Sequence, residues 1–286
     1  MSDAANANTN AAAAPAAGAD AGAAPVAPPE PSFEEVQAAF ADVQTRVQAA
    51  VAARVSAKGP SHDQGVRLVA VSKTKSAECT MNAYKSGARI FGENYAQEMV
   101  DKAPKLPDDC QWHFIGHLQS NKANFIVNGV PNLDFVETVD SEKLASKLNN
   151  AVLNSTRKDR PLNVLVQINT SGEESKSGVS PSDGTAVAIA KHVVEKCPAL
   201  RFRGLMTIGM PDFTSTPANF ECLRNVRSEV AAALGVAENT LELSMGMSGD
   251  YEAAIAMGST NVRVGSTIFG KRAKKPATPP KSPKSS

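Results

Sequence analysis

Short apolar runs alternate with longer runs of helical periodicity over most of the chain. Several of the short runs are continuously apolar instead of alternating with polar residues, which favours parallel strands buried on both faces. Eight such runs predict strands: RLVAVS (67–72), RIFGE (89–93), CQWHFIG (110–116), LDFVETV (133–139), LNVLVQIN (162–169), RFRGLMTIG (201–209), LELSMGMS (241–248) and VRVGSTIFG (262–270).

Helical patterns precede the first strand and separate most of the others. Residues 33–55 carry apolar side chains at helical spacing, so a helix is expected before the first strand. Further helices are predicted over residues 76–87, 141–154, 181–196, 219–234 and 250–258. Ser141 is expected to cap one of them, and Ser180 followed by Pro181 is expected to open another, as helix N-terminal preferences suggest.

Eight strands with intervening helices over about 215 residues fit a single α/β domain of the (β/α)8 TIM-barrel type. The chain has 286 residues, enough for one such barrel over residues 33–272. The rival fold is an open doubly wound sheet. No G-x-G-x-x-G follows the first strand, which weakens the dinucleotide-binding form of that rival.

Low-complexity tails flank the predicted barrel. Residues 1–32 are almost all Ala, Pro, Gly and Asn, and residues 273–286 form a basic tail rich in Lys, Pro and Ser. Such segments bury too little apolar surface to offset the entropy of ordering, so both are expected to be disordered. The N-terminal stretch has no Arg or Lys and no bulky apolar core, which argues against a transit or signal peptide.

Composition narrows the classes of partner. The formal net charge is +1, which gives no indication of nucleic-acid binding, and no apolar run approaches the length of a membrane helix. The four cysteines form no C-x-x-C pair, which favours reduced thiols over disulfides or metal ligands. We therefore expect a cytoplasmic protein with no membrane or nucleic-acid partner. A monomer is also expected, although composition does not bear on the oligomeric state.

The first predicted strand ends in a lysine. The apolar run from Leu68 to Val71 stops at Ser72 and Lys73. In a (β/α)8 barrel, ligand-binding groups lie at the C-terminal ends of the strands, where Lys73 would stand. Other polar or flexible residues occupy the equivalent places on later strands: Asn94, Tyr95, His117, Asn169, Thr170, Ser244, Met247, Ser248, Arg263, Gly265 and Ser266.

A half-buried lysine has a definite chemistry. Burial and nearby positive charge lower its pKa, and the neutral amine then attacks aldehydes to form a Schiff base. Two barrel proteins use such a lysine: an aldolase that attacks its substrate carbonyl, and a protein that holds the aldehyde of pyridoxal 5′-phosphate (PLP). The alternative is an ordinary surface lysine just beyond the strand, and Lys73 alone does not separate the three.

The end of the chain favours a phosphate site. Ser248 and Gly249 precede an Ala-rich helix, where backbone N–H groups favour an anion. Gly265 and Ser266 offer a second set of N–H groups, with Arg263 nearby as a cation. Barrels commonly place a phosphate between the loops after strands seven and eight, which are neighbours of strand one. A lysine beside a phosphate site suits PLP.

Six motifs occur in order and resemble one family. They are A-V-S-K-T-K, F-G-E-N-Y-x-Q-E, W-H-F-I-G-H-L-Q-x-N-K, G-L-M-T-I, L-S-M-G-M-S-x-D and V-R-V-G-S-x-I-F-G. Together they are similar to the pyridoxal phosphate homeostasis protein family, also called the YggS/PROSC family, over roughly residues 35–272. The resemblance implies a barrel like the alanine racemase N-terminal domain, with PLP as cofactor. Where family members often carry Pro after K-T-K, this chain has Ser76.

The resemblance also assigns residues. It implies the Schiff base on Lys73, with Lys75 as the competing position, and an arginine near the cofactor at Arg263. It implies phosphate contacts at Ser248, Gly265 and Ser266, and positions close to the ring at Asn94 and Met206. His113 and His117, four residues apart on a presumed strand that would turn both to one side, are expected to pack or hydrogen-bond, and no metal site is expected.

The function that the resemblance implies is binding and buffering of PLP, with delivery to apo PLP-dependent enzymes as a further role and no established turnover. A racemase needs an acid or base on each face of the bound substrate. After the eighth strand this sequence has only a short basic tail, and none of its three tyrosines lies there. The alternatives are a PLP enzyme such as a weak amino-acid racemase, and a PLP-sensitive interaction protein whose tails bind partners.

Overall fold

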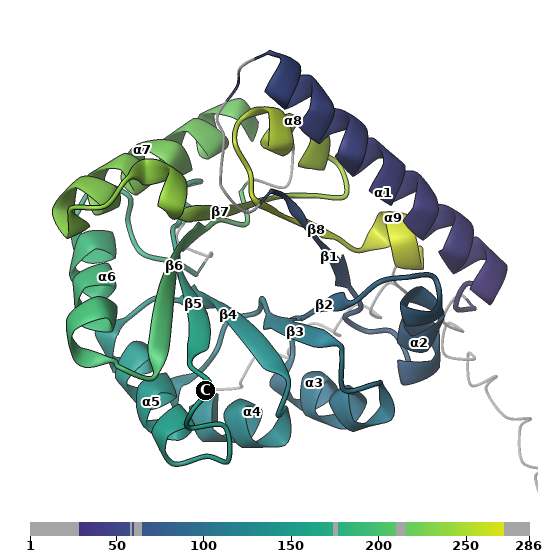
Figure 1. The fold of residues 1–286 in the computed structure, drawn as a ribbon, viewed down its shortest axis with the longest axis horizontal. Helices are drawn as coiled ribbons and strands as arrows, with labels where there is room; N and C mark the ends of the chain where they lie inside the picture. Colours follow the sequence, from purple (N-terminus) through teal and green to yellow (C-terminus); the bar gives the residue numbers. More distant parts are fainter. Residues whose placement is uncertain (1–28, 58, 60–64, 174–176, 210–215, 272–286) are drawn as a thin grey trace, which may run out of the picture. The chain divides into compact units, whose positions relative to one another are not determined.

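Eight parallel strands close into a barrel in which each strand pairs with its neighbours in chain order (Figure 1). The sheet closes where β1 pairs with β8, in the register Val69 opposite Arg263. The predicted single α/β barrel is thus confirmed. The strands are β1 Arg67–Val71, β2 Ile90–Glu93, β3 Gln111–Phe114, β4 Leu133–Val139, β5 Leu162–Gln167, β6 Leu200–Met206, β7 Glu242–Met247 and β8 Asn261–Val264.

The computed structural model describes residues 29–57, 59, 65–173, 177–209 and 216–271. The helices in these ranges are α1 Phe33–Ser56, α2 Ala77–Lys85, α3 Ala96–Lys102, α4 Ala123–Gly129, α5 Glu142–Leu153, α6 Thr185–Lys196, α7 Thr216–Leu234, α8 Tyr251–Ala256 and α9 Ser266–Phe269. Three short 3₁₀ turns join them: η1 Ala103–Lys105, η2 Ser120–Lys122 and η3 Glu238–Thr240.

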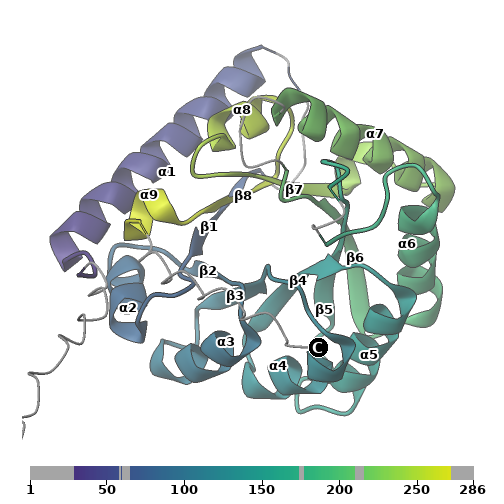
Figure 2. The ribbon, with the colours of Figure 1, turned by 180° about the vertical axis from the view of Figure 1, so that it is seen from behind.

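The helices form an outer ring around the barrel (Figures 1 and 2). The long helix α1 lies across α8 and α9 and beside α2, so it covers the seam where β8 meets β1. Ser32 and Glu35 begin α1 with a capping box: the Ser32 hydroxyl accepts from the Glu35 amide at 3.2 Å, and the Glu35 carboxylate accepts from the Ser32 amide. Because neighbouring strands are all parallel, their C-terminal ends lie at the same end of the barrel.

The eight predicted strands and six predicted helices are present, and several of their ends are shifted. Three of these shifts are large or change the position of a named residue. The predicted helix at Ser180–Pro181 begins only at Thr185, because Gly184, at φ 76°, stands at its N-cap. The eighth predicted strand ends at Val264, and its second half is the short helix α9. The third strand ends at Phe114, so His113 and His117 do not share a strand face: His113 is fully buried and the side chain of His117 is half exposed.

Residues 29–32 of the predicted N-terminal tail make contacts with the barrel domain. Beyond the capping role of Ser32, the Glu30 carboxylate accepts hydrogen bonds from the amide and hydroxyl of Ser76, which caps α2. Residues 1–28 and 273–286 of the two predicted tails lie outside the described residues. All four cysteines are free, as predicted. Within the described ranges, no helix is long and apolar enough to cross a membrane.

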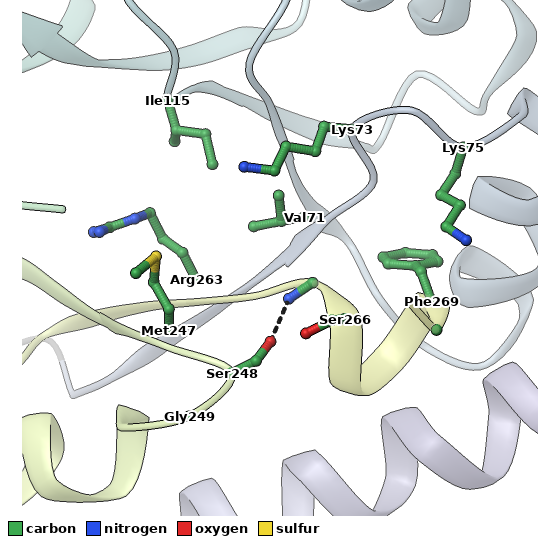
Figure 3. A pocket seen from close by; sticks show the side chains of 12 residues that line it. Val71, Lys73, Lys75, Ile115, Met247, Ser248, Gly249, Arg263, Ser266 and Phe269 are labelled. Atoms are coloured by element: carbon green, nitrogen blue, oxygen red, sulfur yellow. Dashed lines mark hydrogen bonds between the residues drawn. The ribbon is translucent and has the colours of Figure 1, made fainter. Parts of the chain in front are cut away.

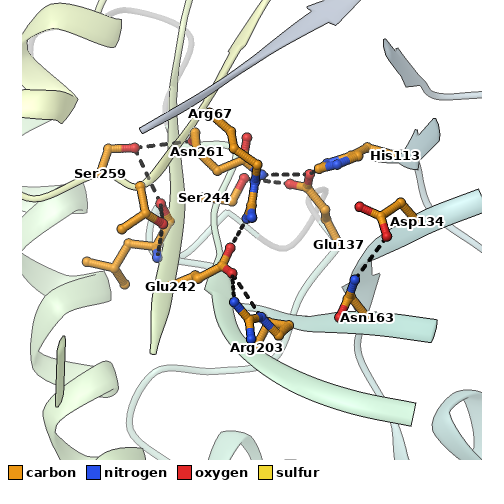
Figure 4. Close-up of polar contacts among 12 residues, drawn as sticks. Arg67, His113, Asp134, Glu137, Asn163, Arg203, Glu242, Ser244, Ser259 and Asn261 are labelled. Carbon is orange, nitrogen blue, oxygen red and sulfur yellow. Dashed lines mark hydrogen bonds and ion pairs between the residues drawn. The ribbon is translucent and has the colours of Figure 1, made fainter. Parts of the chain in front are cut away.

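The barrel interior carries buried charges (Figure 4). Nearer the N-terminal ends of the strands, Glu242 of β7 pairs with Arg67 of β1 and with Arg203 of β6, the latter at 2.7 Å. Arg67 also lies over the Phe135 ring, 4.6 Å from its centroid. Barrels of this type usually fill their interior with layers of branched apolar side chains. In this barrel, ion pairs replace some of those apolar side chains.

A second buried group surrounds Glu137 of β4. Its carboxylate binds Nδ1 of His113 at 2.6 Å and the side-chain amide of Asn261 at 2.9 Å, and it accepts from the Ser244 hydroxyl (Figure 4). Burial opposes ionisation, but the hydrogen bonds from His113 and Ser244 and the charges of His113 and Arg263 outweigh it and hold the pKa of Glu137 at about 2. Glu137 is therefore a buried anion, and its carboxylate lies 4.0 Å from the guanidinium of Arg263.

Candidate functional site

A cavity of about 250 Å³ opens at the C-terminal ends of β1, β3, β7 and β8 (Figure 3). This is just below the range of about 300–1,000 Å³ that is usual for small-molecule sites. It lies at the end of the barrel where such folds place their ligands. Its lining consists of Val71, Lys73, Lys75, Ile115, Met247, Ser248, Gly249, Arg263, Gly265, Ser266, Phe269 and Gly270.

Two lysines enter the cavity from the turn that follows β1. The strand ends at Val71, and the amide of Lys75 donates to the carbonyl of Ser72 at 3.1 Å, which closes the turn. In Figure 3 the amino group of Lys73 points into the cavity toward Arg263, whereas the side chain of Lys75 runs toward Phe269. Both lysines line the cavity, and their amino groups point to different parts of it.

The loops after β7 and β8 are joined through Ser248. Its hydroxyl accepts a hydrogen bond from the backbone amide of Gly265 at 3.1 Å (Figure 3). A side chain at position 265 would crowd β1, because a Cβ there would lie 3.2 Å from the carbonyl oxygen of Val71. The carboxylate of Asp250 accepts from the Met247 amide, which holds the first loop in place. Ser248 and Ser266, one from each of these two loops, both line the cavity.

Arg263 forms part of the cavity wall from inside the barrel. Its side chain is nearly fully buried, and it donates to the Thr207 carbonyl at 2.6 Å and to the Ser244 hydroxyl. Burial lowers the pKa of Arg263, while the charges of Glu137 and Asp250 oppose that shift. A guanidinium stays protonated in proteins, so Arg263 is a fixed cation whose orientation is set by β6 and β7.

The lining is rich in hydrogen-bond donors and positive charge. Among the described residues that line the cavity, Lys73, Lys75 and Arg263 are cationic and none is acidic. Ser248 and Ser266 add two hydroxyls, and Val71, Ile115, Met247 and Phe269 supply apolar surface. Such a cavity suits a small ligand that combines an anionic group with a flat apolar part.

The structure brings together five of the seven predicted cofactor-binding residues: Lys73, Ser248, Arg263, Gly265 and Ser266. The other two lie elsewhere. Met206 is buried in the barrel against Phe135 and Leu165. Asn94 is half-buried after β2. Its backbone lies close to Gly116, because a Cβ atom added to Gly116 would be 1.9 Å from the carbonyl oxygen of Asn94. Neither belongs to the cavity lining.

Other predicted strand-end residues do not join this cavity. Asn169 and Thr170 follow β5 and line a separate, much smaller hollow, where Thr170 and Thr207 hydrogen-bond at 2.8 Å. Tyr95 is half exposed, and the side chain of His117 lies 3.6 Å from Asp140. In the described part of the chain, no group of three His, Cys, Asp or Glu side chains is placed to hold a metal ion.

Sequence reasoning missed the buried polar residues that support the site. Glu137, Glu93 and Lys102 are all nearly inaccessible, and each makes hydrogen bonds with residues beside the cavity or beneath it. A signal for the first two was present: a carboxylate inside an otherwise apolar strand pattern. Lys102 lies on α3, where a lysine is ordinarily solvated, so the sequence pattern does not indicate that it is buried.

Comparisons with known proteins show the class of protein to which this chain belongs. Residues 48–273 match the family described as alanine racemase, N-terminal domain. The chain is 49% identical over 259 residues to the human pyridoxal phosphate homeostasis protein, covering 86% of this chain and 90% of the human one. The chain belongs to the pyridoxal phosphate homeostasis protein family, as the sequence motifs predicted.

Solved structures show the same fold. A protein from Bifidobacterium adolescentis superposes with a TM-score of 0.70 at 36% identity, over 83% of this chain and 95% of that one. PipY from Synechococcus elongatus, solved with PLP bound, superposes with a TM-score of 0.59 at 32% identity, over 77% of this chain and all of PipY.

Proposed function

We propose that this chain binds PLP in the cavity at the C-terminal end of the barrel and takes part in PLP homeostasis. The observation that carries the proposal is the lining itself. One end presents the amino group of Lys73, the other end presents the hydroxyls of Ser248 and Ser266, and no described lining residue is acidic. PLP has a matching distribution, with an aldehyde and a phosphate dianion flanking one aromatic ring.

Lys73 holds the aldehyde in this proposal. Its amine condenses with the aldehyde carbon, which forms a C=N bond and releases one water, so neither an oxidant nor a reductant is needed. Lys73 is favoured over Lys75 because its amino group points toward the interior of the cavity, between Ile115 and Arg263 (Figure 3). The amino group of Lys75 lies beside Phe269, away from that interior.

The two loops after β7 and β8 bind the phosphate. The Ser248 hydroxyl accepts from the Gly265 amide through its oxygen, which leaves its own hydrogen to donate to a phosphate oxygen. Ser266 provides a second hydroxyl in the same lining. Arg263 faces the ring portion as a fixed cation. The cofactor-binding roles of Asn94 and Met206 stay predictions, since neither lines the cavity.

The relatives support the same ligand. PipY is described as solved with PLP bound, and the human relative carries the name pyridoxal phosphate homeostasis protein. PipY shares the fold of this chain at 32% identity, and the human relative is 49% identical to it in sequence. We extend the ligand of PipY to this chain because its own cavity has the donors that PLP requires.

The proposal is storage and delivery to apo PLP-dependent enzymes, without turnover. Chemistry on a bound amino acid needs a second proton donor on the face opposite the lysine. Of the three tyrosines, Tyr84 bonds Asp109 on the outside, Tyr251 is buried in α8 beneath Arg46, and Tyr95 is half exposed. None of them lines the cavity, and no histidine or carboxylate does so among the described lining residues.

Borohydride trapping tests the proposal. The purified protein loaded with PLP should absorb at about 420 nm, as a protonated Schiff base does. Reduction followed by peptide mapping should place the pyridoxyl group on Lys73. Lys73→Met should abolish the band, and Lys75→Met should keep it. A label on Lys75 alone, or no band in the wild type, would contradict the assignment.

A further inference from the structure

Lys73 stands in a strained turn. Thr74, the next residue, has φ 64°, and it is the only non-glycine residue at positive φ among those that the structure describes. For a β-branched side chain this left-handed region is a true outlier. Such a conformation persists only where the surrounding structure holds it, and it often marks a functional position.

Side chains from β2 and α3 hold this turn on both sides of Lys73. Before it, the Ser72 carbonyl accepts from Lys102 Nζ at 2.8 Å, and the Ser72 hydroxyl donates to Glu93 Oε1 at 2.7 Å. After it, the Thr74 amide donates to Glu98 Oε2 at 2.7 Å. Lys102 joins the two halves, since its Nζ lies 2.7 Å from Glu93 and 3.4 Å from Glu98.

The burial of this group argues against an ordinary surface ion pair. Glu93 and Ser72 are fully buried, and the Lys102 side chain is 8% exposed. Burial raises the pKa of Glu93, and Lys102 opposes that shift. Buried ion pairs contribute little to stability compared with apolar packing, but they can impose one particular arrangement. Here the arrangement imposed is the backbone on either side of Lys73.

We infer that Glu93, Glu98 and Lys102 are positioning residues: they hold the turn at Thr74 in its left-handed conformation and so fix where the amino group of Lys73 lies in the cavity. The three residues, called here the turn clamp, contact Ser72 and Thr74 on either side of Lys73. None of the three belongs to the cavity lining itself. The inference rests on the proposed function, because it concerns the lysine that forms the Schiff base with PLP.

The turn clamp acts on Schiff-base formation and not on phosphate binding. Without it, Thr74 relaxes to an ordinary backbone region and carries Lys73 away from the aldehyde. Strain of this kind corresponds to a factor of about 5 to 30 in an equilibrium constant. The phosphate contacts at Ser248 and Ser266 belong to other loops and remain.

Two ligands separate these effects. PLP binds through both the aldehyde and the phosphate, whereas pyridoxine 5′-phosphate has the same ring and phosphate but no aldehyde. The ratio of the two affinities, measured by titration on the same protein, reports Schiff-base formation alone. Borohydride trapping on Lys73, quantified by mass spectrometry, gives an independent reading of the same step.

Glu98→Ala is the principal variant, because Glu98 is partly exposed and its loss leaves the buried pair intact. The affinity ratio should fall by about 5- to 30-fold, with pyridoxine 5′-phosphate binding unchanged. Asp101→Ala is the matched control: it removes an exposed carboxylate from the same helix, one that accepts a hydrogen bond from the side chain of Gln97. Its ratio should stay at the wild-type value.

Replacing Thr74 by glycine gives a rescue that a merely structural role would not show. Glycine adopts positive φ about as readily as negative φ, so the turn no longer needs to be held. The double variant Thr74→Gly/Glu98→Ala should therefore recover most of the ratio lost in Glu98→Ala. Lys102→Met should lower the ratio as well, and its melting curve shows whether the domain stays folded.

The outcomes are distinct. A wild-type protein that forms no Schiff base on Lys73 overturns the proposed function and the inference with it. A wild-type Schiff base with an unchanged ratio in Glu98→Ala overturns the inference alone. Equal losses for PLP and pyridoxine 5′-phosphate, or a double variant as weak as the single one, would show that the turn clamp supports the whole domain and not the position of Lys73.

Discussion

The Ser248 hydroxyl accepts a hydrogen bond of 3.1 Å from the backbone amide of Gly265, across 17 residues of chain. This contact joins the loops after β7 and β8 into one surface at the end of the cavity. The Ser248 hydroxyl is thereby held by its oxygen and oriented before any ligand arrives. A preorganised donor costs less to use when a phosphate binds.

Removing these hydroxyls should weaken PLP binding. Ser248→Ala and Ser266→Ala each delete one hydrogen bond to a dianion, worth about 1.5–3 kcal/mol, so each should weaken binding about 10- to 150-fold. The affinity is measured by titration of the absorbance band. Ser182→Ala, which changes an exposed serine bonded only to the neighbouring Ser180, serves as the control. An unchanged affinity in the double variant Ser248→Ala/Ser266→Ala would move the phosphate elsewhere.

The lowered pKa of Glu137 predicts that the folded protein loses stability in acid. Its pKa is lowered from 4.5 to about 2 in the folded protein. A carboxylate whose pKa is lower in the folded than in the unfolded state stabilises the fold fully at any pH above its unfolded-state pKa. This contribution is lost as the pH falls toward the folded-state pKa. The shift corresponds to about 3 kcal/mol. That contribution should be complete at pH 7 and should disappear between about pH 4.5 and pH 2.

Urea unfolding of the wild type and Glu137→Gln checks this point. At pH 7 the variant should be less stable by about 3 kcal/mol, since three donors lose their anionic acceptor. The gap should close as the pH is lowered from about 4.5 to about 2. Glu229→Gln, on the exposed side of α7, should show no gap at any pH. A difference that persists undiminished at pH 2 would assign the loss to packing.

The barrel could be predicted because each strand has a recognisable pattern in the local sequence. Parallel strands buried on both faces appear as continuous apolar runs, and β4 was placed with its observed bounds. The sequence pattern predicts an eighth strand that is too long, because the residues after Val264 are as apolar as the strand itself. Only the turn at Gly265, packed against Val71, shows that the chain there becomes helical. Boundaries set by such tertiary contacts leave little trace in a pattern.

The site was predictable in part for a similar reason. Lys73, Ser248 and Arg263 follow or end strands, so the barrel topology alone brings them to one face. Met206 has the same kind of position, but its side chain packs inside the barrel against Phe135. Which way a strand-end side chain points depends on the pleat and on local register shifts, such as the one between β5 and β6.

The buried charges could not be predicted, because each depends on partners far away in the sequence. Glu137 binds Asn261 across 124 residues, and Glu242 binds Arg67 across 175. A carboxylate in an apolar run signals that some partner exists, since an unpaired buried charge is very unfavourable. The pattern does not say which residue supplies it. That information comes only with the closed barrel.

PLP bound in this cavity should be transferable to other proteins. The Schiff base on Lys73 forms and breaks with the gain or loss of one water, and the cavity is open at the strand ends. Any apo PLP enzyme that binds the phosphate more tightly can therefore capture the released cofactor. Mixing the loaded protein with such an enzyme should restore the enzyme's activity while the absorbance at about 420 nm fades. Protein reduced by borohydride, in which the bond to Lys73 is permanent, should restore none.

The same cavity should support little chemistry on amino acids. A positioned acid or base contributes about 10²–10⁴-fold, and the described lining offers such a group on the lysine side only. Added L-alanine should therefore change the spectrum, as it displaces Lys73 from the aldehyde, without yielding D-alanine. A chiral assay over a panel of L-amino acids measures this. Racemisation, decarboxylation or transamination at about 1 s⁻¹, the low end of ordinary kcat values, would make the protein an enzyme and overturn the storage role.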